Sequence, residues 1–387
     1  MDKELIYKGF FGLERETLRV DINNRLAQTP HMLGESGEIT RDFCENQIEI
    51  VTPVCGSIEE VMTQLKRLDT KVRKVLDEHN EHIWLYSNPP HFDSEDEIPV
   101  ADFRGEHSGK RIYREHLERR YGKRLMLFSG IHFNLSFDDS YLKSICGSEN
   151  LTEFKNSFYL RLYKQFSRYS WLPLLLTAAS PVYDRSLLED GEEGAAAGEY
   201  ASIRSGRKGY WNEFVPELRF GSLEEFIDSI RFYVDKGALS SASELYLPVR
   251  LKPKGVNKLE SFKNGVSHIE LRMLDINPFE PLGINSDDLR FAHLMMIYLS
   301  EQPDFDYTAE MQRQAVENHK NAALLDLDGV EIEGVPILEK AAEVLDDMSE
   351  RFADSAERLR VIEYERNKLK DRLAVRIVSG ELCKKRV

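Results

Sequence analysis

Cysteine pairs, long apolar runs and an export signal are all missing from this 387-residue sequence. Its four cysteines are scattered without the CxxC spacing of a zinc site or the density of a disulfide framework. The longest apolar stretch, residues 171–179, is far shorter than the roughly 20 residues that a membrane span needs. No apolar segment followed by a small-residue cleavage site opens the chain. We therefore expect a reduced, cytoplasmic protein that does not enter a membrane.

Positive charge is also scarce, because 52 lysines and arginines face 67 aspartates and glutamates, giving a formal net charge of −15. This balance argues against a nucleic-acid binder, which normally presents a basic face. It also argues against an anchor on an anionic membrane surface. A composition of 41% hydrophobic and 31% charged residues is ordinary for a globular protein with a large core. Small molecules are therefore the expected partners.

Neither of the common glycine-rich phosphate loops occurs in the chain: it has no GxxxxGK[ST] motif and no GxGxxG motif after a strand. A bound nucleotide would have to be held by a metal and by basic side chains, and the planar arginine fork suits phosphate oxygens. For each basic residue the alternative is a surface charge or a structural ion pair. The candidates are Arg114, Arg204, Arg250, Lys252 and Arg272.

Helices are predicted in several places. Ser57-Ile-Glu-Glu60 and Ser222-Leu-Glu-Glu225 are typical of capping boxes that begin helices. Apolar spacing predicts further helices over 154–171 and 288–299, and a long one over 338–362. The apolar stripe of that last helix fits packing against its own domain better than a dimer seam. A monomer and a homodimer both remain open.

Three segments alternate between apolar and polar residues as half-buried strands do: 131–137, 245–252 and 268–273. The first carries His132, Asn134 and Ser136 on its polar face. The third pairs Glu270 with Arg272. Because helices and strands do not alternate regularly, we expect an α+β fold with an antiparallel or mixed sheet and helices behind it.

Carboxylates gather on the polar faces of these and neighbouring strands. Glu14 and Glu16 are two apart, Asp42 and Glu49 bracket a segment that ends as a strand, and Glu270 adds a fifth. Converging carboxylates repel one another unless a cation neutralises them, and a set of oxygen ligands suits Mg²⁺ or Mn²⁺. For a single Glu-x-Glu pair, solvated strand charges are the commoner explanation. Several such segments together favour a lined cavity.

The sequence leaves three roles open for His132 and excludes one role for Cys44. His132 could be a base, a substrate donor or a core histidine satisfied by hydrogen bonds. Cys44 lies between Asp42 and Glu45, whose negative charge disfavours a thiolate, so we reject it as a nucleophile.

Over residues 8–300 the chain resembles bacterial glutamate–cysteine ligases. Segments such as GLERETLRV (12–20) and IELRMLDINPFEPLGI (269–284) occur in that family's order. Further segments that carry the resemblance are 42–53, 113–125, 129–137, 179–181, 202–210 and 244–253. The resemblance implies a glutamine-synthetase-like fold, in which a curved, mainly antiparallel sheet forms a funnel with helices outside. It implies a catalytic domain over 1–300, with 301–387 as a helical extension on the same domain.

The resemblance also implies site residues. The implied Mg²⁺ or Mn²⁺ ligands are Glu14, Glu16, Asp42, Glu49 and Glu270. The implied catalytic residues are Arg272, Glu49 and Arg114, and the implied ATP and phosphate contacts are Arg250, Lys252 and Arg272. The implied substrate pocket is formed by Phe43, Arg114, His132, Asn134, Arg204, Tyr210 and Tyr246.

The implied reaction is the ATP-dependent joining of the glutamate γ-carboxylate to the amine of cysteine through a γ-glutamyl phosphate, the first step of glutathione synthesis. The chain has no ATP-grasp segment, so we expect the γ-glutamyl dipeptide as its product. The alternatives are a ligase for another amine, a non-catalytic glutamate or nucleotide sensor, and a guanidino or carboxylate kinase. Two departures from the family pattern, at 84–90 and 206–208, suggest a remodelled turn and an altered neighbourhood of the acceptor pocket.

Overall fold

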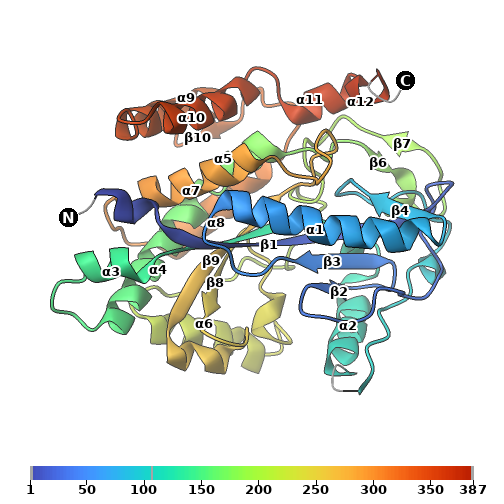
Figure 1. Ribbon diagram of the computed structural model, residues 1–387, viewed down its shortest axis with the longest axis horizontal. Helices are drawn as coiled ribbons and strands as arrows, with labels where there is room; N and C mark the ends of the chain where they lie inside the picture. The colour runs from blue at the N-terminus through green and yellow to red at the C-terminus, as the bar shows by residue number, and fades with distance from the viewer. Residues whose placement is uncertain (1–2, 106–107, 385–387) are drawn as a thin grey trace.

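A computed structural model describes residues 3–105 and 108–384, without the side chains of Lys3, Cys383 and Lys384. Its central element is an open seven-stranded sheet in the order β2-β3-β1-β5-β9-β8, with β4 paired to β1 (Figure 1). Every pairing within this sheet is antiparallel, which confirms the predicted sheet type. Its strands are β1 (Gly9–Asp21), β2 (Ile39–Arg41), β3 (Gln47–Val51), β4 (Glu81–Trp84), β5 (Ile131–Phe137), β8 (Val249–Pro253) and β9 (Val266–Leu274).

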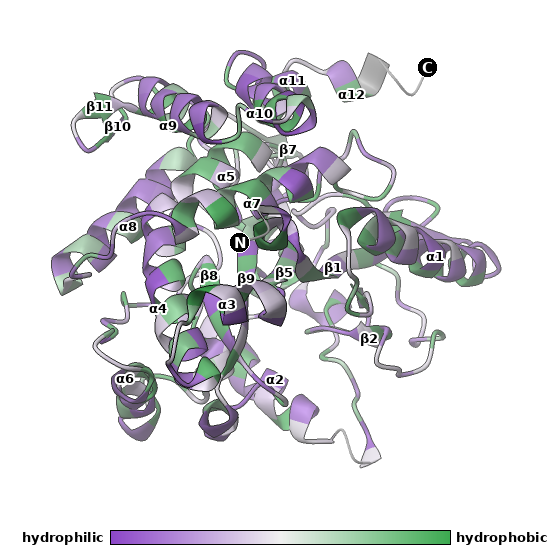
Figure 2. Ribbon diagram, turned by 60° about the vertical axis from the view of Figure 1, so that its left-hand side comes forward, coloured by the Kyte–Doolittle hydropathy of each residue, from purple (hydrophilic) through white to green (hydrophobic). Residues whose placement is uncertain are grey.

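One face of the sheet is apolar and is covered by helices (Figure 1). The helices that contact it or pack directly on that layer are α1 (Ile58–Asp77), α4 (Leu151–Tyr169), α5 (Trp171–Thr177) and α7 (Ser286–Ser300). Every residue of α5 is buried, and Figure 2 shows α5 and α7 mostly green. An apolar surface around a whole helix is typical of a helix inside a protein. The helices predicted over 154–171 and 288–299 are thereby confirmed, the first divided at Ser170 into α4 and α5.

The remaining elements surround this core. The other helices are α2 (Ser108–Tyr121), α3 (Asp139–Ile145), α6 (Leu223–Asp235), α8 (Ala309–Ala322), α9 (Ile337–Arg351), α10 (Ala356–Lys368), α11 (Leu373–Val378) and α12 (Glu381–Lys384). Two small hairpins are formed by β6 (Tyr183–Asp184) with β7 (Ala195–Ala196) and by β10 (Glu331–Ile332) with β11 (Val335–Pro336). Within the described ranges, no helix has the length and apolar character of a membrane span.

The predicted helix starts are confirmed in part. Ser57 accepts a hydrogen bond from the Glu60 amide, and Ser222 accepts one from the Glu225 amide, as N-caps do. The capping box predicted at Ser57 is wrong in its second hydrogen bond, because the Glu60 carboxylate accepts from the Gly56 amide and not from the Ser57 amide. Glu60 therefore holds the backbone of Gly56, the residue before the N-cap Ser57.

Two predicted elements have different limits in the structure. The strand predicted over 245–252 begins only at Val249, because the backbone of 242–244 forms a short 3₁₀ turn and Pro248 has no amide hydrogen to donate. The single long helix predicted over 338–362 is wrong: α9 ends at Arg351, and Ser355 starts α10 as its N-cap. Both helices contact α7. Leu338 points outward with 39% of its surface exposed, so it is not part of the buried stripe.

Strand register determines which side chains share the polar face. Glu14 lies opposite His132, Glu16 opposite Glu49, and Glu270 opposite Asn134 on one side and Arg250 on the other. Between β5 and β9 the register shifts, because β9 advances from Leu271 to Leu274 while β5 advances from Phe133 to Ile131. Such a bulge re-aims the side chains around it. Here it lies at Arg272, beside His132.

Candidate active site

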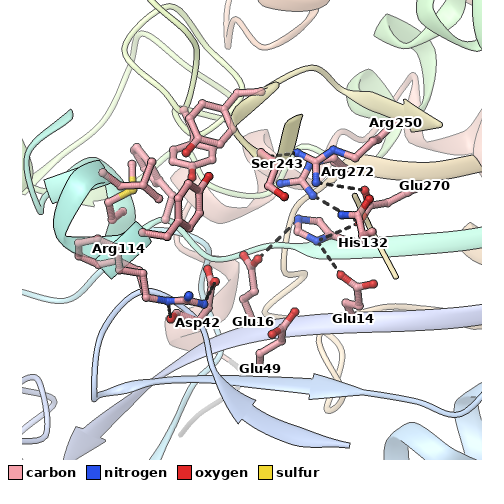
Figure 3. A pocket seen from close by; sticks show the side chains of 18 of the residues that line it. Glu14, Glu16, Asp42, Glu49, Arg114, His132, Ser243, Arg250, Glu270 and Arg272 are labelled. Carbon is pink, nitrogen blue, oxygen red and sulfur yellow. Dashed lines mark hydrogen bonds and ion pairs between the residues drawn. The ribbon is translucent and has the colours of Figure 1, made fainter. Parts of the chain in front are cut away.

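The polar face of the sheet forms the floor of a cavity of about 220 Å³ (Figure 3). Strands β1, β3, β5, β8 and β9 supply the floor, and α2 with five connecting segments supplies the walls. The cavity is lined by Glu14, Glu16, Asp42, Phe43, Glu49, Tyr113, Arg114, Leu117, Met126, Phe128, His132, Arg204, Tyr210, Ser243, Tyr246, Arg250, Lys252, Asn257, Glu270 and Arg272. This set contains every predicted site residue except Asn134.

His132 lies at the centre of three carboxylates (Figure 3). Its Nδ1 is 3.4 Å from Glu14 Oε2 and 3.8 Å from Glu270 Oε1, and its Nε2 is 3.6 Å from Glu16 Oε1. Asn134 lies just outside the cavity and donates a 3.0 Å hydrogen bond to Glu14 Oε1, while its own oxygen contacts His268 Nε2 at 3.0 Å. Asn134 therefore orients the Glu14 carboxylate.

Glu270 is fully buried, and three cations surround it. Lys252 Nζ, Arg272 Nη1 and Arg250 Nη1 lie 3.1, 3.4 and 3.8 Å from its carboxylate oxygens. Burial opposes ionisation, yet the charges of Lys252 and Arg272 hold the pKa of Glu270 well below its usual range. Among the residues that the structure describes, neither oxygen has a hydrogen-bond partner with proper geometry. Glu270 therefore lines the cavity with both oxygens free of a hydrogen-bond donor.

The first acidic group of the cavity consists of Glu14 and Glu270 with His132, and a second consists of Glu16, Asp42 and Glu49. Glu16 and Glu49 are direct cross-strand neighbours. Burial raises the pKa of Glu16, and burial together with the Asp42 charge raises the pKa of Glu49 well above its usual range. Like charges placed opposite each other on a sheet are destabilising. The charges of Arg114, Arg204 and Arg272 act on this group but do not offset the burial and repulsion that raise these two pKa values.

One of the two acidic groups brings its ligand atoms together as a cation site does. Glu14, His132 and Glu270 each offer one ligand atom, and these atoms all lie within 4.8 Å of one another. Carboxylate oxygens suit Mg²⁺ or Mn²⁺, and the unbonded oxygens of Glu270 have free coordination capacity. A cation would also remove the repulsion that raises the pKa of Glu49.

A tight loop carries Arg204 and Tyr210. The guanidinium of Arg204 lies against the backbone of Gly130, where a Cβ would come within 2.3 Å of it, and donates a 2.8 Å hydrogen bond to the Arg272 carbonyl. Gly209 permits the turn, because a Cβ there would be 1.9 Å from the Arg204 carbonyl oxygen. These glycines are required for close approach, and they bring Arg204 beside Glu16 and Asp275.

The other end of the cavity is an apolar wall. Arg114 closes its edge by donating from Nε to the Asp42 carbonyl oxygen and by placing Nη2 3.3 Å from Asp42 Oδ1. The ring centroids of Tyr210 and Tyr246 are 4.1 Å apart. We define the apolar wall as Phe43, Tyr113, Leu117, Met126, Phe128, Tyr210 and Tyr246. The site is thus charged at one end and apolar at the other.

Sequence reasoning missed six residues that line the cavity. Two of them, Tyr113 and Leu117, share a face of α2 with Arg114, and this helical spacing is a signal that could have identified them. The others stand in short turns, where no periodicity indicates direction. The missed residues are Tyr113, Leu117, Met126, Phe128, Ser243 and Asn257.

The two departures from the family pattern, and Cys44, contribute no side chain to the cavity lining. Arg207 pairs with Glu317 of α8 at 2.7 Å and Lys208 with Glu199 at 3.0 Å, so residues 206–208 do not alter the cavity lining. In the 84–90 turn, Asn88 donates to the carbonyls of Ser180 and Val182. Cys44 is buried and free, and burial raises the pKa of its thiol, in agreement with its rejection as a nucleophile. Cys383 lies outside the residues whose side chains the structure describes.

Comparisons with known proteins agree with the motifs. Residues 1–238 and 233–322 match the model of the family described as glutamate-cysteine ligase. A bifunctional glutathione biosynthesis protein of Listeria monocytogenes is 37% identical over 373 residues, which are 90% of this chain and 48% of the relative. The corresponding protein of Clostridium perfringens is 34% identical, with the same coverage. The chain therefore spans about half the length of these relatives.

Two solved structures have the same fold. A bifunctional glutathione synthetase from Pasteurella multocida superimposes with a TM-score of 0.83 and 28% identity, over 97% of this chain and 50% of that one. A glutamate–cysteine ligase from Francisella tularensis, in complex with AMP, gives a TM-score of 0.83 at 24% identity over 96% of this chain and 84% of that one. The second likeness, at that identity, bears on the fold alone.

Proposed function

The chain belongs to the glutamate–cysteine ligase family, and from that premise we propose that it joins the γ-carboxylate of glutamate to the amine of cysteine at the expense of ATP. One observation carries the proposal: a single cavity combines clustered carboxylates and cations at one end with an apolar wall at the other. The charged end suits a metal-bound triphosphate and a dicarboxylate. The apolar end suits a small, uncharged side chain.

The charged end would hold the metal and the phosphates. Glu14, His132 and Glu270 would bind one Mg²⁺ or Mn²⁺, and Glu16, Asp42 and Glu49, which line the same cavity, would bind another. Bound there, the metal would neutralise phosphate charge and make phosphoryl transfer easier. His132, which the family resemblance assigned to the substrate, fits a ligand role better because its nitrogens face carboxylates only.

The cationic side chains would stabilise the transferred phosphate. Arg272 lies on the cavity floor, and the charges of Glu270 and Glu16 raise its pKa against the effect of burial, so it stays charged. A γ-carboxylate oxygen of glutamate would attack the γ-phosphorus of ATP. The new O–P bond forms as the bond to the bridging oxygen breaks and ADP leaves. Such a transfer needs positioning and charge more than covalent help from the protein, and Arg250 and Lys252 add to that charge.

The second half-reaction would take place at the border of the two ends. The amine nitrogen would attack the acyl carbon as the bond from that carbon to the phosphate oxygen breaks. The proton from the amine goes to the leaving phosphate or to a neighbouring carboxylate. Arg204 is positioned to pair with the carboxylate of the acceptor amino acid, and Phe43, Leu117 and Met126 offer an apolar contact for its side chain. Apolar pockets discriminate weakly, by roughly 1–3 kcal/mol per methylene.

The test is ADP release by the purified chain with ATP, Mg²⁺ and glutamate across a panel of amines, with metal omitted as the control. We expect ADP release with cysteine and a much smaller rate with larger or charged amino acids. Loss of activity without metal, and its recovery with Mn²⁺, is expected too. Turnover with another amine and none with cysteine would disprove the acceptor. ATP binding without turnover under any condition would indicate a sensor, and a free phosphorylated product would indicate a kinase.

A further inference from the structure

A buried carboxylate outside the cavity connects three of the segments that build its apolar wall. Glu244 is fully buried, and none of its atoms lines the cavity. The segments that it joins are the C-terminal turn of α2, the loop 240–246 and the segment 204–212. Each of these segments supplies residues to the cavity lining, among them Leu117, Tyr246 and Tyr210.

The first connection runs to α2. Tyr121 donates a 2.7 Å hydrogen bond to Glu244 Oε1, Arg120 Nη1 lies 3.0 Å from the same oxygen, and His116 Nε2 lies 3.9 Å from Oε2. Arg120 also donates to the Ala238 carbonyl at 2.6 Å. Leu117 is the only residue of α2 that is buried. Leu117 packs in an apolar cluster with Tyr113 and Tyr121 against it. The position of this helix depends in addition on two polar contacts: Arg114 with Asp42 at its middle, and Glu244 at its end.

The second connection closes the loop 240–246 on itself. Glu244 Oε2 accepts from both the amide and the hydroxyl of Ser240, at 2.6 and 2.5 Å. Burial opposes the charge of Glu244, but these bonds and that from Tyr121 lower its pKa. The carbonyls of Ser243 and Leu245 then accept from Arg250 Nη2 at 2.9 and 3.1 Å. The loop whose geometry Glu244 fixes thus contacts Arg250, a cation of the charged end.

The third connection reaches the segment that carries Tyr210. Asn212 Nδ2 donates to the Glu244 carbonyl at 2.7 Å and to Tyr121 at 3.2 Å, and Asn212 Oδ1 accepts from the Tyr246 amide at 2.9 Å. The Tyr121 ring meets the Tyr246 ring edge to face at 5.5 Å, and Tyr246 contacts Tyr210. A shift of Glu244 is thereby transmitted to two of the three tyrosines of the apolar wall, Tyr246 and Tyr210.

We propose that Glu244 is the positioning residue of the acceptor end: it fixes the spacing between α2, the loop 240–246 and the segment 204–212, and so determines how tightly the amine substrate is held. This inference rests on the proposed function. Small misplacements of substrate-positioning groups cost on the order of 100-fold in rate. Of the metal and phosphate groups, Arg250 meets this network through the Ser243 and Leu245 carbonyls, and Asp42 meets it through Arg114 of α2. The others stand on strands, so we expect the largest effect on the amine.

The test compares Glu244→Gln, which keeps the shape and removes the charge, with Glu118→Gln, a control on α2, the helix that Glu244 holds; the Glu118 carboxylate contacts Lys123 at 3.4 Å. In Glu244→Gln we expect the KM for cysteine to rise roughly 10- to 100-fold, without a comparable rise in the KM for ATP or glutamate. Hydrogen–deuterium exchange should speed up over 108–121 and 240–246. Glu118→Gln should match the parent in both measurements.

A purely structural role gives a different result: kcat falls with the folded fraction, and no KM changes. That result, or unchanged exchange in α2, overturns the proposal. If Glu244→Gln does not fold, Tyr121→Phe carries the test, since it removes one hydroxyl and keeps the ring on Tyr246; the same selective rise, smaller in size, is expected. If the parent forms no γ-glutamyl amide, the proposed function has failed, while the exchange measurement still decides whether Glu244 holds the wall.

Discussion

The two ends of the cavity are built in different ways. At the charged end, Glu14, His132 and Glu270 project from neighbouring strands, and antiparallel register fixes their mutual distances. At the apolar end, helix α2 and two loops are held by side-chain hydrogen bonds among residues far apart in the chain, such as Tyr121 and Glu244. A sheet tolerates little relative motion of its strands, whereas a wall of tethered segments can adjust to a ligand. We therefore expect the charged end to fix the chemistry and the apolar end to fix the choice of amine.

The largest expected effect comes from placing a charge on the buried, apolar face of β9. Ile269 is fully buried on the apolar face, so Ile269→Asp places an unpaired charge in the core. The cost of several kcal/mol is comparable with the whole stability of a domain, about 5–15 kcal/mol. We expect loss of the folded protein in circular dichroism. Ile269→Val is the control and should cost only about 0.5–1.5 kcal/mol.

A change on the opposite face of the same strand should spare the fold. Arg272→Ala removes a cation that faces the cavity, and we expect kcat to fall on the order of 100- to 1,000-fold, with a melting temperature close to that of the parent. Calorimetry together with the ADP-release assay would measure both. Equal unfolding of Arg272→Ala and Ile269→Asp would contradict the assignment of the two faces.

These two faces were predictable from the sequence because strand alternation is a local property. The spacing of Glu14 and Glu16, or of Glu270 and Arg272, places each pair on one face wherever the strand lies. The apolar wall was not predictable in the same way. Glu244 meets Tyr121, which is 123 positions away, and no periodicity within residues 240–246 indicates that contact.

The fold was predictable to a similar degree. Long amphipathic helices such as α1 and the antiparallel sheet were predicted, and the structure has both. The break between α9 and α10 was missed because the apolar spacing continues through Phe352 and hides the capping serine, Ser355. The strand at 245 was misjudged for a tertiary reason, because Glu244 and Asn212 hold that backbone in another conformation.

A smaller effect is expected from the turn that carries the apolar wall. Gly209→Ala would bring a Cβ to 1.9 Å from the Arg204 carbonyl oxygen, so the loop 203–210 must shift. We expect a destabilisation of about 1–3 kcal/mol and a KM for the amine that rises more than the KM for ATP. Gly37→Ala is a suitable control, because its Cβ would meet nothing within 4 Å. A uniform fall in kcat with unchanged KM values would mean that the two ends are not separable.

The effect that is smallest at neutral pH concerns acid stability, and it also distinguishes the wall from the sheet. His319 of α8 is buried behind Arg204, where it contacts Trp211 edge to face and Ser170 Oγ at 3.0 Å. Burial lowers its pKa to about 3. The unfolded chain takes up the proton near pH 6.5 and the folded chain does not, so stability falls as the pH drops below about 6.5, by roughly 1.4 kcal/mol per pH unit for this group. Denaturant titrations of the parent and of His319→Gln between pH 4 and 7 should show a shallower pH slope in the variant. If His319→Gln leaves the pH slope of stability unchanged, the acid sensitivity arises elsewhere than behind the wall.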